Sequence, residues 1–120
     1  MARILLVDDD PATLAMVSRA LGADGHQVVV CQGGQDALDR LLAAPAAFDL
    51  LVSDLQMPGL DGVGLAQRAV AASPRLRIVL MSGFIGGIER AHAIKGAVVR
   101  FLSKPFTLDA IRTEVRAALA

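Results

Sequence analysis

Five short apolar runs, separated by longer segments of helical period, limit what this 120-residue chain can fold into. Each run is of strand length, and most are rich in β-branched residues. Right-handed crossovers between consecutive strands of one sheet leave parallel pairing as the common arrangement. The sequence therefore predicts an α/β fold, a doubly wound five-stranded parallel sheet with helices on both faces. The predicted strands are residues 3–7, 27–31, 49–53, 77–81 and 98–102.

The segments between the runs carry apolar residues at helical spacing. Gly22, Pro45 and Pro74 follow three of these segments and can each end a helix. Thr107 precedes the last segment as a predicted N-cap. The predicted helices lie at about residues 14–21, 37–42, 63–70, 87–95 and 108–119.

Composition excludes several classes of function. The twelve basic and twelve acidic residues give no net charge, so there is no basic field to attract nucleic acid or an anionic membrane. The single cysteine, Cys31, excludes an internal disulfide. No apolar run has the length of a signal peptide or a membrane helix. We therefore expect one domain over residues 1–120, in a cytoplasmic protein that binds neither nucleic acid nor membrane.

Polar residues follow four of the five predicted strands. Asp8 and Asp9 follow the first strand, Asp54 the third, Ser82 the fourth and Lys104 the fifth. Ligands of doubly wound sheets bind at the carboxyl ends of the strands, so these side chains are expected to meet. Clustered carboxylates suit Mg²⁺, and a hydroxyl and an ammonium add donors for phosphate oxygens. The set indicates phosphoryl transfer to a carboxylate.

The motifs VDDD (7–10), SDLQMPGLDG (53–62), MSG (81–83) and LSKPF (102–106) resemble the receiver domain of two-component response regulators. The resemblance covers essentially the whole chain and implies a flavodoxin-like (β/α)5 fold. It also implies an Mg²⁺-dependent domain that takes phosphate from a histidine kinase or phosphotransfer protein and loses it by slow hydrolysis. The tract MSGF (81–84), with the variable segment after it and the stretch from Phe101 to the end, is similar to receivers fused to the C-terminal ends of hybrid histidine kinases. The methionine at position 1 equally fits a free-standing receiver.

The resemblance also implies roles for the acidic residues. Asp54 would be the phosphoacceptor. Asp9 would ligate Mg²⁺ directly, and Asp8 would assist through water. The backbone carbonyl of Gln56 would supply a further ligand.

Three further residues match switch and phosphate-binding positions of the family. Ser82 would be the hydroxyl switch residue and Phe101 the aromatic switch residue. Lys104 would hold the phosphoryl group, with Pro105 fixing its loop. On phosphorylation, such a domain changes its protein-binding surface and acts on an unknown downstream protein.

Some of these residues have simpler structural explanations. Asp10 precedes Pro11 and is expected to cap the first helix. Asp61 is expected to be a turn residue beside Gly62 and is left out of the site. The alternative function is a receiver-like adaptor that signals by protein contact without phosphate.

The first predicted helix offers a surface for a kinase. Leu14, Val17 and Leu21 share the face expected to pack on the sheet. The opposite face lies beside the acidic site and is expected to dock a kinase helix bundle. This docking patch consists of Ala12, Ala15, Met16 and Arg19.

Overall fold

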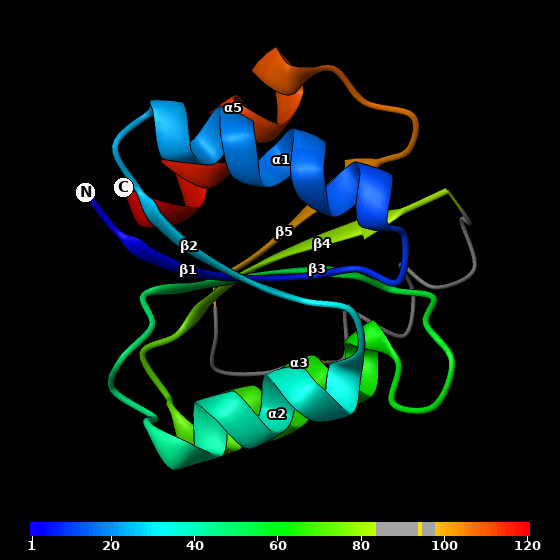
Figure 1. Ribbon diagram of the computed structural model, residues 1–120. Helices are drawn as coiled ribbons and strands as arrows, with labels where there is room; N and C mark the ends of the chain where they lie inside the picture. Colours follow the sequence, from blue (N-terminus) through cyan, green and yellow to red (C-terminus); the bar gives the residue numbers. More distant parts are fainter. Residues whose placement is uncertain (84–93, 95–97) are drawn as a thin grey trace.

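The computed structural model describes residues 1–83, 94 and 98–120. Within them, five parallel strands form one sheet in the order β2-β1-β3-β4-β5 (Figure 1). The prediction of a parallel α/β sheet is confirmed, although two strands begin one residue later than expected. The strands are β1 (Arg3–Val7), β2 (Gln27–Cys31), β3 (Leu50–Asp54), β4 (Arg77–Ser82) and β5 (Val99–Ser103).

Helices cover both faces of the sheet, with α1 and α5 on one face and α2 and α3 on the other (Figure 1). The predicted fourth helix, within 87–95, falls on residues that the structure does not describe, apart from the buried Ile94. No helix in the described part is long and apolar enough to cross a membrane. The helices are α1 (Pro11–Ala23), α2 (Gly34–Ala43), α3 (Gly62–Ala72) and α5 (Leu108–Leu119).

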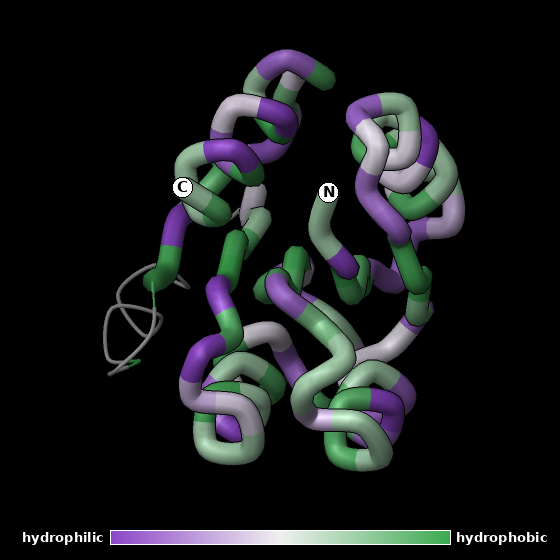
Figure 2. Tube along the Cα trace, turned by 90° about the vertical axis from the view of Figure 1, so that its left-hand side faces the viewer, coloured by the Kyte–Doolittle hydropathy of each residue, from purple (hydrophilic) through white to green (hydrophobic). Residues whose placement is uncertain are grey.

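Alternating side chains of the strands fill two separate cores. Ile4 and Leu6 of β1 pack toward α1 and α5, whereas Leu5 and Val7 pack toward α2 and α3. The inner strands are buried almost throughout, as expected for parallel strands covered on both faces, and the edge strands β2 and β5 are partly exposed. Figure 2 shows the resulting layers, with hydrophobic strands between two pairs of helices.

Side-chain caps begin three of the four helices. The predicted caps are confirmed, because Asp10 accepts from the Ala12 N–H and Thr107 accepts from the Ala110 N–H. The interpretation of Asp61 as a plain turn residue was incomplete. Its carboxylate accepts from the Gly64 N–H at 2.8 Å, so it is the N-cap of α3.

The end of α1 differs from the prediction. The helix continues through Gly22 to Ala23, and Asp24 is its C-cap. Gly25 follows with φ of 88° and donates its N–H to the Gly22 carbonyl. Gly25 therefore supplies the left-handed residue that ends the helix, and Gly22 only contributes a carbonyl to that turn.

Candidate functional site

Strand register brings the predicted site residues to one edge of the sheet. Strands β1 and β3 pair up to the residues just before Asp8 and Asp54, so these two aspartates are neighbours at adjacent strand ends. Strands β4 and β5 pair up to Ser82, and Lys104 directly follows β5. The edge includes the point between β1 and β3 where the strand order reverses, where doubly wound sheets bind ligands.

Lys104 joins two of the aspartates. Its Nζ lies 2.9 Å from Asp8 Oδ2 and 3.3 Å from Asp54 Oδ2. The Asp8 side chain is fully buried and that of Asp54 is 10% exposed. Because buried charges are costly unless paired, the ammonium is needed to hold both carboxylates inside the fold. The other Asp8 oxygen accepts from the Asp10 N–H at 2.9 Å.

The site shifts the ionisation of its own groups. Burial, followed by the charge of Asp8, raises the pKa of Asp54 above its ordinary value, and Lys104 offsets only part of this. Burial alone would lower the pKa of Lys104, but its hydrogen bond to Asp8 and the nearby Asp54 charge outweigh burial and raise that pKa. The lysine therefore remains a cation between two acidic groups.

The acidic residues fit a divalent metal. Asp8, Asp9 and Asp54 each offer a carboxylate oxygen, and these oxygens all lie within 4.8 Å of one another. Asp9 is exposed, so one side of the cluster is open to solvent. Mg²⁺ prefers a few carboxylates together with water and phosphate oxygens, and this donor set matches that preference.

The remaining predicted site residues lie around the cluster. The Gln56 backbone N–H faces Asp54 Oδ1 at 3.4 Å. Ser82 is buried, and its carbonyl accepts from the Lys104 N–H at 2.9 Å. Phe101 is partly buried and packs against the core beneath α2 and α3. The Lys104-Pro105 peptide bond is cis.

The predicted docking patch is exposed, as expected. Its four residues all lie on the solvent side of α1. They line a groove of about 500 Å³ between α1 and α5, to which Leu108 and Arg112 also contribute. Helix α1 begins directly after the acidic residues, so the groove lies close to the site.

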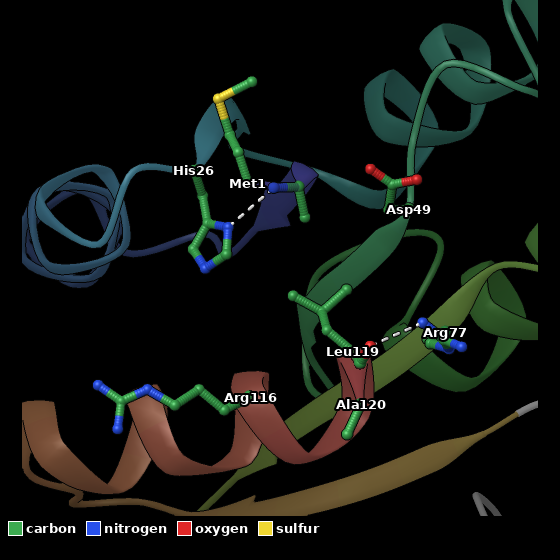
Figure 3. Close-up of a pocket in the computed structure, with 8 residues that line it drawn as sticks. Met1, His26, Asp49, Arg77, Arg116, Leu119 and Ala120 are labelled. Carbon is green, nitrogen blue, oxygen red and sulfur yellow. Dashed lines mark hydrogen bonds between the residues drawn. The ribbon is translucent and has the colours of Figure 1, made fainter.

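A second cavity, of about 440 Å³, lies at the opposite end of the sheet (Figure 3). The Ala2 N–H donates to His26 Nδ1 at 3.0 Å, and Arg77 donates to the Leu119 carbonyl at 3.0 Å. The first bond joins the residues that precede β1 and β2, and the second joins β4 to the end of α5.

Sequence reasoning missed the ion pairs of Lys104. It placed this lysine at the correct edge of the sheet, opposite a phosphoryl group, but did not pair it with Asp8 and Asp54. These ion pairs could have been predicted from the sequence, because a cation and several carboxylates are expected at the same edge of the sheet.

Comparison with known proteins identifies the family. The fold is a doubly wound parallel sheet with an acidic cluster and a lysine at its carboxyl edge, where sheets of this kind bind ligands. Residues 4–116 match the model of the response regulator receiver domain, and the chain belongs to that family.

Individual relatives agree with this assignment. The chain is 34% identical over 119 residues to the response regulator receiver protein CpdR of Brucella abortus, covering 99% of this chain and 98% of CpdR. It is 33% identical to the response regulator MprA of Mycolicibacterium vanbaalenii, covering 98% of this chain and 50% of MprA. Relatives therefore include both proteins of this length and proteins about twice as long.

Solved structures share the fold. The chemotaxis protein CheY4 of Vibrio cholerae superposes with a TM-score of 0.87 at 25% identity, covering 99% of each chain. The receiver domain of the hybrid histidine kinase CckA superposes with a TM-score of 0.83 at 30% identity, covering 98% of this chain and 99% of that one. The resemblance to receiver domains, including one from a hybrid kinase, is confirmed.

Mg²⁺ is expected to stabilise the fold by relieving repulsion within the acidic cluster. At a metal concentration roughly a hundred times the Kd, the gain is about 2.7 kcal/mol. Asp9→Asn should remove most of this gain because it takes one charge out of the cluster. Asp10→Asn is the matched control, since it removes an adjacent charge outside the cluster and asparagine still caps a helix. Urea unfolding with and without Mg²⁺ measures the gain in stability of each protein. An equal gain in Asp9→Asn and in the parent would place the ion elsewhere.

Asp54→Asn is expected to make the Mg²⁺-free protein more stable near neutral pH, because the amide removes a buried charge. A carboxyl whose folded pKa is raised contributes most to stability below its unfolded pKa, and this contribution is lost as pH rises through the folded pKa. The advantage of the variant should therefore shrink as pH falls toward the ordinary aspartate value of 3.8. Thermal melts in EDTA across this range check it, and a pH-independent difference would contradict it.

Proposed function

We propose that this receiver domain accepts a phosphoryl group on Asp54 from a histidine kinase or phosphotransfer protein, in an Mg²⁺-dependent reaction, and then changes its protein-binding surface. Receiver domains as a family interact with such kinases and with downstream effectors. A cytoplasmic location is part of this proposal.

One observation carries the proposal, namely the convergence of three carboxylates and one lysine at the edge where the strand order reverses. Among the three, Asp54 is held by the lysine on one side and by the Gln56 N–H on the other. A carboxylate fixed in this way is preorganised to attack a phosphorus atom.

In the proposed transfer, an Asp54 oxygen forms a bond to phosphorus while the nitrogen-phosphorus bond of the donor phosphohistidine breaks. The donor imidazole leaves, and Asp54 becomes an acyl phosphate. When bound, Mg²⁺ would neutralise charge on the phosphoryl oxygens, with Asp8, Asp9, Asp54 and the Gln56 carbonyl as its proposed ligands. Once Asp54 carries the phosphoryl group, the Lys104 ammonium can pair with a phosphoryl oxygen.

Ser82 and Phe101 are the proposed switch residues. Ser82 ends β4 beside the acidic edge, and its hydroxyl is a suitable donor to a phosphoryl oxygen. Phe101 lies on the neighbouring strand, where it pairs with Leu80 and packs, partly buried, against the core. These two residues would carry the change from Asp54 toward β5.

A phosphate-independent adaptor is the alternative function. It would require the fold and its surfaces but not the acidic cluster. Buried Asp8 and Asp54 are costly for stability alone, and an adaptor has no evident need for them. The site therefore favours phosphorylation.

Asp54→Asn is expected to abolish labelling by acetyl phosphate in the presence of Mg²⁺, because an amide cannot form an acyl phosphate. Asp61→Asn serves as the matched control, since it makes the same exchange at a helix cap outside the cluster and should label like the parent. Phosphate incorporation per chain is measured over time. Undiminished labelling of the Asp54 variant would refute the assignment, and an unlabelled parent would favour the adaptor.

We also propose that the docking patch receives a helix of the phosphodonor protein. Met16 is 41% exposed, and with the neighbouring alanines it forms an apolar surface flanked by Arg19. A donor histidine must approach Asp54 closely, and α1 begins beside Asp54 at the same edge. An amphipathic helix laid in the groove between α1 and α5 would satisfy both conditions.

Ala15→Glu is expected to slow transfer from a histidine kinase by about tenfold or more, since it places a charge in an apolar contact. Labelling by acetyl phosphate should be unchanged, because the small donor needs no docking. Ala71→Glu, on the exposed side of α3, is the matched control and should affect neither reaction. The kinase used is one that phosphotransfer profiling identifies as a donor for this domain. An equal loss of labelling with the kinase and with acetyl phosphate would count against docking.

A further inference from the structure

Gly34, the first residue of α2, lies against the loop that leads away from Asp54. It is buried, and a Cβ placed on it would lie 2.2 Å from the Leu60 carbonyl oxygen and 3.1 Å from the carbonyl carbon. Real side chains do not tolerate such distances, and the atoms that would have to move belong to the backbone. The close approach of α2 to Leu60 therefore requires a glycine.

The loop in question covers residues 55–61 and connects the end of β3 to the start of α3. At its start, the Leu55 N–H donates to the Met81 carbonyl at 2.9 Å, and the Leu55 carbonyl accepts from the Gly62 N–H at 2.9 Å. At its end, Asp61 caps α3. Both ends are thus fixed by hydrogen bonds, and the first turn of α2 supports the loop at Leu60.

Gly62 holds the same loop against Asp54 itself. A Cβ on Gly62 would lie 2.3 Å from the Asp54 carbonyl oxygen and 2.8 Å from the Leu55 Cα. The two glycines therefore allow close backbone approach at opposite ends of the loop, Gly62 at Asp54 and Gly34 at Leu60. The backbone is therefore closely packed near both ends of the loop, and we expect a displacement at Leu60 to reach the residues beside Asp54.

Gln56 lies in this confined loop. Its N–H faces Asp54 Oδ1, and its carbonyl is the proposed backbone ligand of the metal. Unlike a side-chain ligand, a backbone carbonyl has no rotamer with which to adjust, so its position depends on the path of the whole loop. Groups that do not touch the metal but orient its ligands can be as important to metal affinity as the ligands themselves.

We propose that Gly34 is a positioning residue for phosphoryl transfer, which lets α2 support the 55–61 loop and so fixes the Gln56 backbone beside Asp54. This inference rests on the proposed function. It assigns a role at the acidic site to a helix that supplies none of the acidic residues.

Gly34→Ala tests the inference, with Gly33→Ala as the matched control. Gly33 is the N-cap of the same helix, and a Cβ there would meet nothing within 4 Å. Both variants replace a glycine at the start of α2, but only Gly34→Ala pushes on Leu60. Gly34→Ala should lower Mg²⁺ affinity and the rate of acetyl phosphate labelling by about tenfold or more. Gly33→Ala should leave both within about twofold of the parent.

A purely structural role is separated from positioning by comparing the folded fractions. Urea unfolding gives the folded fraction of each variant, and affinity and rate are expressed per folded molecule. The Gln56 amide resonance, recorded without Mg²⁺, should shift in Gly34→Ala and not in Gly33→Ala. A lower urea midpoint with unchanged Gln56 resonance, affinity and rate would overturn the inference, as would equal losses in both variants.

Two further results keep the test decisive. If Gly34→Ala does not fold in buffer, it is measured in sucrose beside the parent and Gly33→Ala, because an excluded osmolyte favours the folded state. Parent-like Mg²⁺ binding by Gly34→Ala under these conditions would overturn the inference. If the parent neither binds Mg²⁺ nor is labelled, the proposed function fails, whereas the Gln56 resonance still reports whether Gly34 positions the loop.

Discussion

The ion pairs of Lys104 with Asp8 and Asp54 are the interaction on which the site depends. Two carboxylates buried at adjacent strand ends would repel each other, and the lysine makes their burial tolerable. The arrangement requires three strands to end in register at one edge, which the order β2-β1-β3-β4-β5 provides. Fold and site are therefore two results of one sheet topology.

The strands and the acidic edge could be predicted because both depend on local patterns. Apolar runs identify parallel strands, and residues just after them, such as Asp8 and Asp54, must lie at the carboxyl edge. Contacts between elements distant in sequence were not predictable in this way. The approach of Gly34 to Leu60 depends on how α2 packs beside the loop after β3, and the end of α1 at Gly25 depends on a backbone turn. The sequence predicts only a turn at Asp61, whereas in the structure its carboxylate caps α3.

The two layers of helices have different roles in the proposed function. In the proposed function, α1 begins at the acidic edge and presents the docking patch, so that layer would receive the phosphodonor. In the layer of α2 and α3, Gly34 and Gly62 allow the backbone to pack closely against the loop after Asp54. Close backbone packing on that side and an exposed groove on the other suit a site that must be both preorganised and accessible.

The proposed phosphorylation of Asp54 can be tested by the position and the chemical stability of the phosphoryl group. The protein would be treated with acetyl phosphate and Mg²⁺, and its phosphate content and position determined by mass spectrometry before and after hydroxylamine, which cleaves acyl phosphates. We expect one phosphate per chain, on the peptide containing Asp54, absent in EDTA and removed by hydroxylamine. A phosphate that resists hydroxylamine, or that maps to another residue, would contradict it.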